Sequence, residues 1–356
     1  MADKIKVLIV DDSALFRKVI SDILQSDPLI EVVGTANNGK SAVIKAQQLD
    51  PDVITMDIEM PIMDGLAALK EIVSIKPKPV IMMSVLTQYG AEATFKALDM
   101  GAVDFVPKPS SVLTLSNEEL GDLLISKVKN VAGSRVRVGS ENVQPESAEK
   151  LKKSDKPSAG KIFEKGSTSS RIVGIGTSTG GPSALLRVFQ DFPENFPSPV
   201  VVVQHMPEGF TRAFSERLNN NSTLKVKEAE DGDKLLPGHG FVAPGHSHIA
   251  VEGKEGNRYL RVYQSDKVSG HRPSIDVLFN SMAASAGKEC VSVIMTGMGR
   301  DGAEGMLKIH EKGGYTIAQD EKTSVVFGMN RVAVQLGAVH EIVPLHEITK
   351  KIVEHI

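Results

Sequence analysis

Apolar strands alternate with amphipathic helices along most of this 356-residue chain, and this alternation limits the folds open to it. Between Lys6 and about Asn130 the pattern repeats five times. The apolar runs are Val7–Val10, Val32–Thr35, Val53–Met56, Val80–Met83 and Val103–Val106. Helical patterns lie near Ala14–Gln25, Gly39–Gln48, Gly65–Ser74, Ala91–Met100 and Asn117–Asn130. Strand–helix units of this kind predict a parallel sheet with helices on both faces.

A second alternating stretch runs from Ile172 to the end of the chain. Its expected strands are Ile172–Ile175, Val200–Gln204, Phe241–Ala243, Ile249–Glu252, Leu260–Tyr263, Val291–Met295 and Tyr315–Gln319. Its expected helices are Pro182–Gln190, Thr211–Asn219, Ile275–Ala286 and Gly302–Glu311. This stretch predicts another α/β domain, with an antiparallel ribbon around residues 240–263.

Residues 131–170, between the two stretches, are rich in Ser, Lys, Glu and Gly and lack apolar periodicity. Such a composition is typical of an interdomain linker. We therefore expect two doubly wound parallel-sheet domains, at residues 1–130 and 171–356. The first is expected to be flavodoxin-like and the second Rossmann-like.

The composition narrows the function classes. A hydrophobic fraction of 41% and a charged fraction of 24% are ordinary for a soluble globular protein. The net charge of −3 argues against a nucleic-acid-binding protein. The single cysteine, Cys290, allows no internal disulfide, and no signal peptide or apolar run of about 20 residues is present. We expect a cytoplasmic protein that does not insert into membranes and is a monomer.

Three acidic side chains and a lysine follow strands of the first domain. Asp11 and Asp12 follow the first strand, Asp57 the third and Lys108 the fifth. Because the carboxyl ends of the strands meet at one crevice, these groups should converge there. Grouped carboxylates suit Mg²⁺, and the lysine would neutralise a phosphoryl group on one of them. Solvated turns or helix caps are the competing interpretation.

The segment "GIGTSTGG", residues 174–181, lies between a strand and a helix of the second domain. It fails the dinucleotide-binding frame, because Thr179 occupies the third glycine position. It fits G-x-S-x-G, in which a sharp strand-to-helix turn exposes the hydroxyl of Ser178. The alternative is a helix N-cap without chemistry. A general base elsewhere in the domain would decide between the two.

Two further residues at strand ends could act with Ser178. His205 follows the strand Val200–Gln204 and could accept the hydroxyl proton. Asp301 follows the strand Val291–Met295 and could orient that imidazole. The glycine-flanked backbone at Met298 could donate an N–H to an oxyanion. A structural histidine and a helix-capping aspartate remain the alternatives. The chain order Ser, His, Asp disfavours an α/β-hydrolase, whose histidine comes last.

Residues 4–125 resemble a response-regulator receiver domain. The resemblance rests on Asp11-Asp12, on Asp57 with Met60-Pro61 and Met63-Asp64-Gly65, on Ser84 and on Lys108-Pro109. It implies that Asp57 accepts phosphate and that Asp12, Asp57 and the Glu59 carbonyl hold Mg²⁺. By the same implication Ser84 and Lys108 bind the phosphoryl oxygens, and Phe105 moves with them. Thr87 competes with Ser84 for this role.

The second domain resembles the CheB family of chemotaxis protein-glutamate methylesterases. The matching stretches contain Ser178, Gln204-His205, His271-Arg272-Pro273-Ser274 and Thr296–Gly302. The resemblance implies hydrolysis of glutamate γ-methyl esters on methyl-accepting chemotaxis receptors, deamidation of receptor glutamines, and no cofactor for the esterase step. It carries over Ser178, His205 and Asp301 as a triad and Met298 as the oxyanion donor. It also implies a chemotaxis histidine kinase as phosphodonor and an unphosphorylated receiver that covers the Ser178 cleft.

Two rival functions belong to other classes. A receiver-linked DNA-binding regulator would need a small basic output domain, which residues 171–356 do not resemble. A catalytically silent receptor-binding module differs only in whether Ser178 reacts. His246 and His248 could form part of a metal site, but no third histidine or cysteine ligand clusters with them. His271 precedes a helix, and the sequence assigns it no chemical step.

Overall fold

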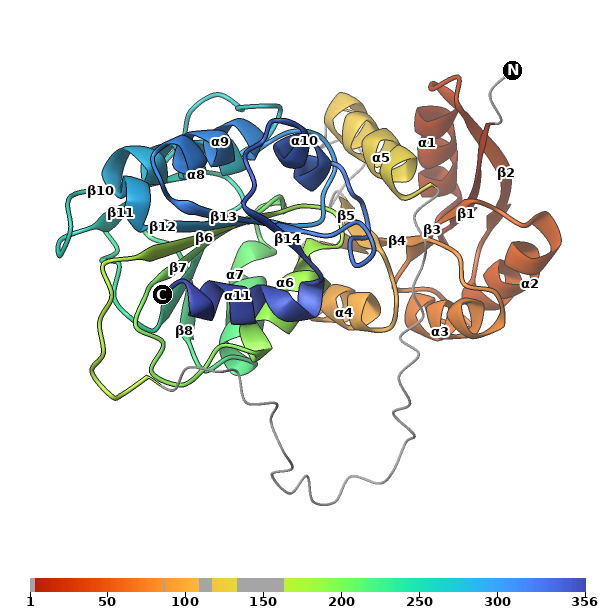
Figure 1. The fold of residues 1–356 in the computed structure, drawn as a ribbon. Coiled ribbons are helices and arrows are strands. Elements are labelled where there is room, and N and C mark those ends of the chain that lie inside the picture. Colours follow the sequence, from red (N-terminus) through yellow and green to blue (C-terminus); the bar gives the residue numbers. More distant parts are fainter. Residues whose placement is uncertain (1–3, 86, 109–116, 133–162) are drawn as a thin grey trace, which may run out of the picture.

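The computed structural model describes residues 4–85, 87–108, 117–132 and 163–356, so most of the predicted linker lies outside it. The described chain forms two main parallel sheets, each flanked by helices (Figure 1). The predicted fold class, two doubly wound α/β domains, is confirmed.

The first sheet has the strand order β2-β1-β3-β4-β5, and all of its neighbouring strands are parallel. Its strands are β1 (Ile5–Val10), β2 (Ile30–Ala36), β3 (Val53–Asp57), β4 (Val80–Val85) and β5 (Asp104–Lys108). Its helices are α1 (Ala14–Gln25), α2 (Gly39–Leu49), α3 (Gly65–Ile75), α4 (Gln88–Asp99) and α5 (Asn117–Val131). Helices α1 and α5 pack together on one face, and α2, α3 and α4 pack side by side on the other. The strand order reverses between β1 and β3, which is where a doubly wound sheet opens its ligand crevice.

The second main sheet has the order β14-β13-β12-β6-β7-β9-β8 and is parallel throughout. Its strands are β6 (Ile172–Thr177), β7 (Val200–Gln204), β8 (Lys225–Glu228), β9 (His239–Val242), β12 (Cys290–Ile294), β13 (Tyr315–Gln319) and β14 (Glu341–Val343). Strand β6 comes first in the chain but lies inside the sheet, so the order reverses between β6 and β12. The crevice of the second domain is therefore expected at the carboxyl end of β6.

Helices cover both faces of this sheet. They are α6 (Gly181–Gln190), α7 (Thr211–Asn220), α8 (Ile275–Ser285), α9 (Ala303–Glu311), α10 (Met329–Gln335) and α11 (Ile348–Glu354), with short 3₁₀ turns η1 (Gly287–Glu289) and η2 (Leu345–Glu347). Helices α8, α9 and α10 lie on one face, and α6, α7 and α11 lie on the other (Figure 1).

One predicted strand has a different partner. An antiparallel ribbon does form, between β10 (His248–Glu252) and β11 (Tyr259–Tyr263). The run Phe241–Ala243 was expected to join it, but β9 instead pairs in parallel with β7 and β8. Phe241 and Val242 are buried. A strand covered on both faces belongs in the interior of a parallel sheet, which explains the difference.

The two domains pack against each other through α4 and α7. The rings of Phe95 and Phe214 lie 5.6 Å apart, and those of Phe105 and Phe210 lie 4.6 Å apart. Arg217 Nη2 donates to Asp99 Oδ1 at 2.6 Å. A single apolar cluster contains buried residues of both domains, so part of the core is continuous across the junction.

Candidate active site and carboxylate pocket

The turn between β6 and α6 holds Ser178 by its backbone. Its N–H donates to the Thr296 carbonyl at 3.0 Å, and its carbonyl accepts from Gln204 Nε2 at 2.9 Å. Gly180, with φ of 76°, is the N-cap of α6, which has no side-chain cap. The Ser178 hydroxyl therefore does not cap this helix, contrary to the alternative interpretation of the glycine turn.

His205 reaches the same end of the sheet from the neighbouring strand. Thr177 of β6 lies opposite Gln204 of β7, and the His205 N–H donates to the Thr177 carbonyl at 3.1 Å. On the other side of β6, Gly176 lies opposite Ile294 of β12, the strand that precedes Asp301. The three predicted residues thus follow three adjacent parallel strands. His205 Nε2 lies 2.8 Å from Asp301 Oδ2.

Asp301 is a buried carboxylate at the start of a helix other than its own. It accepts hydrogen bonds from the Ser274 hydroxyl at 2.7 Å and from the N–H groups of Ile275 and Asp276 at 2.7 and 3.1 Å. These donors form the first turn of α8, whose positive end favours an anion. Burial opposes ionisation, but the hydrogen bonds from His205, Ser274 and Ile275 lower the pKa of Asp301 to about 2. The N-cap of α9 is Gly302, so Asp301 does not cap the helix that follows it.

The ionised Asp301 fixes the tautomer of His205. Because a carboxylate only accepts hydrogen bonds, Nε2 carries the proton and Nδ1 is left as the basic nitrogen. Among the described residues, the buried Nδ1 has no hydrogen-bond partner. A general base needs this arrangement, in which one nitrogen is anchored and the other is free.

His271 forms a wall of this site. Its ring stacks on that of His205, with centroids 3.7 Å apart and an interplanar angle of 10°. Burial, together with the neighbouring His205, lowers the pKa of His271 to about 4. His271 is therefore neutral at physiological pH. The sequence alone left its contribution open.

The backbone at Met298 lies beside the serine. A Cβ added to Gly297 would lie 2.7 Å from the Ser178 Cβ, so this loop runs directly against the turn that holds Ser178. The Gly297 carbonyl accepts from the N–H groups of Gly328 and Met329, at 3.0 and 2.9 Å. No hydrogen bond of the Met298 N–H is found within the described parts of the chain, which leaves it available to an oxyanion.

The two histidines proposed as an alternative metal pair have separate roles. His248 Nδ1 accepts from the Ser274 N–H at 3.2 Å, and its Nε2 lies 3.0 Å from the Asp266 carbonyl. His246 lies 3.7 Å from Glu208 on the surface. His248 therefore supports the loop before α8, with both of its ring nitrogens in use.

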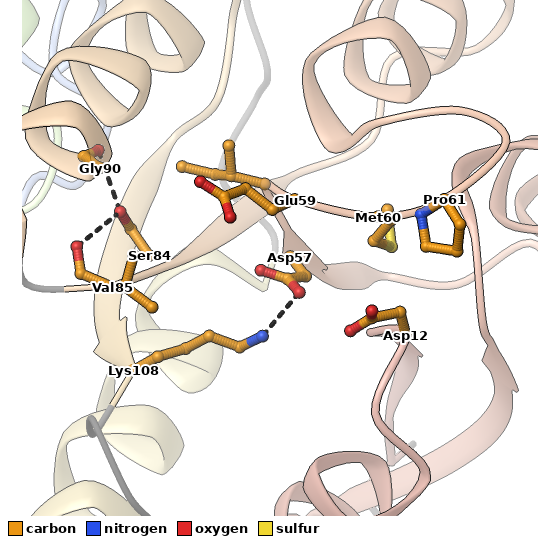
Figure 2. Close-up of a pocket in the computed structure, with 10 residues that line it drawn as sticks. Asp12, Asp57, Glu59, Met60, Pro61, Ser84, Val85, Gly90 and Lys108 are labelled. Atoms are coloured by element: carbon orange, nitrogen blue, oxygen red, sulfur yellow. Dashed lines mark hydrogen bonds and ion pairs between the residues drawn. The ribbon is translucent and has the colours of Figure 1, made fainter.

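The first sheet has its own pocket, a cavity of about 500 Å³ at the β1–β3 crevice (Figure 2). It is lined by Asp12, Asp57, Ile58, Glu59, Met60, Pro61, Ser84, Val85, Gly90 and Lys108. Lys108 Nζ lies 2.6 Å from both Asp57 Oδ2 and Asp11 Oδ2. Burial, with smaller contributions from Asp11 and Asp12, raises the pKa of Asp57 to about 6 against the opposing effect of Lys108.

These acidic residues suit a divalent cation. Oxygen atoms of Asp11, Asp12 and Asp57 lie within 4.8 Å of one another. Three carboxylates face a single ammonium group, so the pocket has the uncompensated negative charge and hard oxygen ligands that Mg²⁺ prefers.

The two candidate hydroxyls differ in position. Ser84 is buried, lines the pocket and donates to the Gly90 carbonyl at 3.0 Å. Thr87 is the N-cap of α4 and accepts from the Gly90 N–H at 2.9 Å. The cap occupies Thr87, which leaves Ser84 as the hydroxyl on the pocket wall. Phe105 does not line the pocket, but packs at the domain junction.

Comparisons with known proteins identify the family of each domain. Residues 173–352 match the family described as CheB methylesterase, and residues 7–118 match the response regulator receiver domain. A protein-glutamate methylesterase/protein-glutamine glutaminase of Pyrococcus horikoshii is 46% identical over 99% of this chain and 94% of its own. One of Thiobacillus denitrificans is 45% identical over 99% of this chain and 96% of its own. The solved CheB methylesterase catalytic domain of Thermotoga maritima covers 53% of this chain and 100% of its own, with 41% identity and a TM-score of 0.52.

None of the helices that the structure describes combines the length and the apolar character needed to span a membrane.

Proposed function

The chain belongs to the CheB methylesterase family and carries a response regulator receiver domain, and on that premise we propose that it hydrolyses glutamate γ-methyl esters on methyl-accepting chemotaxis receptors. Its relatives are also named glutaminases, which supports deamidation of receptor glutamines by the same site. The observation that carries the proposal is the His205–Asp301 pair. His205 follows the strand beside that of Ser178, and its Nδ1 has no hydrogen-bond partner among the residues that the structure describes.

In the first half of the reaction, the Ser178 hydroxyl attacks the γ-carbonyl carbon and its proton passes to His205 Nδ1. Asp301 stabilises the imidazolium that forms, because it stays ionised and bonded to Nε2. The Met298 N–H donates to the oxyanion of the tetrahedral intermediate. When the intermediate collapses, His205 returns the proton to the methoxy group, and methanol leaves.

In the second half, a water molecule attacks the acyl-enzyme. His205 Nδ1 takes a proton from the water and returns it to Ser178 Oγ as the acyl bond breaks, which releases the glutamate side chain. With a glutamine substrate the same steps release ammonia in place of methanol. None of them needs a metal ion or an organic cofactor.

Asp57 is the proposed phosphoacceptor in the receiver. Asp12, Asp57 and the Glu59 carbonyl would hold Mg²⁺, with Asp11 beside them, and the ion would offset the charge of the phosphoryl group. Lys108 would bind a phosphoryl oxygen through its ammonium group. The Ser84 hydroxyl would give up its hydrogen bond to the Gly90 carbonyl and donate to another phosphoryl oxygen. A movement of the Phe105 side chain would then displace Phe210 in the catalytic domain, because the two rings are in contact.

The proposed partners follow from these two chemistries. A chemotaxis histidine kinase supplies the phosphate, and the cytoplasmic portion of a chemoreceptor supplies the ester. The enzyme acts in the cytoplasm as a monomer and adjusts receptor methylation during adaptation.

Methanol release from methylated receptor membranes tests the proposal. We expect Ser178→Ala to retain less than about 1% of the wild-type rate, because loss of a triad nucleophile costs several orders of magnitude. A small-molecule phosphodonor with Mg²⁺ should raise the rate of the wild-type chain and should not affect Asp57→Asn. A Ser178→Ala variant that turns over at more than a few per cent would contradict the assignment. A wild-type chain that binds receptor without releasing methanol would identify the silent module instead.

A further inference from the structure

The side chain of Thr296 lies at the centre of the active-site backbone, although it belongs to neither the triad nor the oxyanion donor. Its hydroxyl is buried, donates to the Thr179 carbonyl at 2.9 Å and accepts from the N–H groups of Val325 and Val326, both at 3.1 Å. A hydroxyl offers one donor and two acceptor positions, so all of them are used here.

The backbone of the same residue adds two more links. The Thr296 carbonyl accepts from the Ser178 N–H at 3.0 Å, and the Thr296 N–H donates to Gln319 Oε1 at 2.9 Å. Thr296 thus joins the nucleophile turn, the loop that leads to Met298, and the segment before α10. None of these hydrogen bonds involves a side chain of the proposed triad.

The segment before α10 also contacts the receiver. Val325 packs against the apolar cluster beneath α1 and α5. On its other side, a Cβ added to Gly180 would lie 2.6 Å from the Val325 Cβ. Val325 therefore lies between the receiver and the turn that holds Ser178. The two hydrogen bonds to the Thr296 hydroxyl hold Val325 and Val326 in place.

We propose that Thr296 is a positioning residue, whose hydroxyl fixes Ser178 and the Met298 N–H relative to each other and ties both to the segment that contacts the receiver. This rests on the proposed esterase function. Without the hydroxyl, the Thr179 carbonyl and two N–H groups would lose their buried partners and the three segments would shift to recover them. Displacements of about 1 Å in a catalytic site can cost roughly a hundredfold in rate.

The test compares Thr296→Val with Thr296→Ser in the full-length protein, with phosphodonor and Mg²⁺ present. We expect Thr296→Val to lower kcat about 10- to 100-fold and to leave KM within about threefold, because no substrate-facing side chain changes. Thr296→Ser keeps the hydroxyl and should stay within about threefold of wild type in kcat. Labelling of Ser178 by a fluorophosphonate probe should slow in parallel with kcat.

Thr349→Val is the matched control. Thr349 is equally buried, and its hydroxyl donates to the Val188 carbonyl at 2.8 Å, away from the triad. This variant loses a buried hydroxyl of the same kind but should keep its kcat.

Four results would overturn the proposal: a Thr296→Val kcat within twofold of wild type, an equal loss in Thr296→Ser, an equal loss in Thr349→Val, or a Thr296→Val protein that unfolds where Thr349→Val does not. Failure of the esterase function itself would be distinguishable, because the wild-type chain would then release no methanol. In that case the rate at which the fluorophosphonate probe labels Ser178 would still show whether Thr296→Val is less reactive than wild type.

Discussion

At the scale of the residue, His271 links solution pH to the stability of the second domain. Its pKa is lowered from 6.5 to about 4, first by burial and then by His205. The unfolded chain therefore binds more protons between these two values, and folding stability falls as pH drops through them. The contribution is fully present above pH 6.5 and amounts to about 3 kcal/mol, at roughly 1.4 kcal/mol per pKa unit.

We predict that His271→Gln flattens this dependence. Between pH 7 and pH 5, the wild-type domain should lose about 2 kcal/mol more unfolding free energy than the variant does. Urea unfolding at both pH values measures the difference. His346→Gln removes an exposed histidine and should retain the wild-type slope. Equal slopes in wild type and His271→Gln would mean that the stacked imidazole does not titrate in this range.

The sequence could place the proposed catalytic residues but not the groups that hold them. Ser178, His205 and Asp301 were found because each follows an apolar strand, and parallel strands bring such residues together. The bonds from the first turn of α8 to Asp301 depend on the angle at which that helix meets the sheet, which no local pattern encodes. Thr296 resembles any small polar residue after a buried strand. Its importance arises only from the three segments that pack around it.

At the scale of the element, long apolar strands and amphipathic helices were predictable, and short ones were not. Strand β8 has the sequence KVKE with a single valine, and β14 has only three residues. Both lie at sheet edges, where tertiary pairing rather than an apolar run defines the strand. Helices α10 and α11 have seven residues each, too few for the apolar period to repeat reliably.

The contact between α4 and α7 leads to a prediction about regulation. Arg217 of α7 binds Asp99 of α4, and its guanidinium lies 5.6 Å from the centre of the Phe95 ring. A partly exposed ion pair contributes about 0.2–1 kcal/mol, and a cation–π contact adds about 0.5–1 kcal/mol. Removing both would weaken the packing of the receiver on the catalytic domain by roughly 1–2 kcal/mol, which shifts the population of this docked arrangement about 5- to 30-fold.

We therefore expect Arg217→Ala to raise the basal methanol release of the unphosphorylated full-length protein at least threefold. Arg187→Ala is the matched control, because Arg187 pairs with Asp191 within its own domain. An unchanged basal rate in Arg217→Ala would mean that the α4–α7 contact does not limit the activity.

At the scale of the whole molecule, the receiver borders the approach to the active site. A cavity of about 770 Å³ is lined by Asn130 and Ala132 from the receiver side and by Met298, Val325 and Phe327 from the catalytic side. The substrate is a side chain on a large protein, so it needs open space beside the proposed oxyanion donor. The receiver therefore forms one wall of the space that the proposed substrate would have to enter.

Removing the receiver should therefore release the activity. The Thermotoga maritima catalytic domain, solved on its own, matches this half of the chain over its full length, so a protein beginning near Ser167 is expected to fold. We predict that it hydrolyses receptor methyl esters at least about tenfold faster than the unphosphorylated full-length protein, equivalent to about 1.4 kcal/mol of inhibition. It should also ignore phosphodonor, since Asp57 is absent. Methanol release by both proteins, with and without donor and Mg²⁺, measures both effects.

If the truncated protein is no faster than the unphosphorylated full-length protein, covering of the active site by the receiver does not inhibit the enzyme. The receiver would then act by activating the catalytic domain, through contacts such as Val325 against the nucleophile turn, or by bringing it to the receptor.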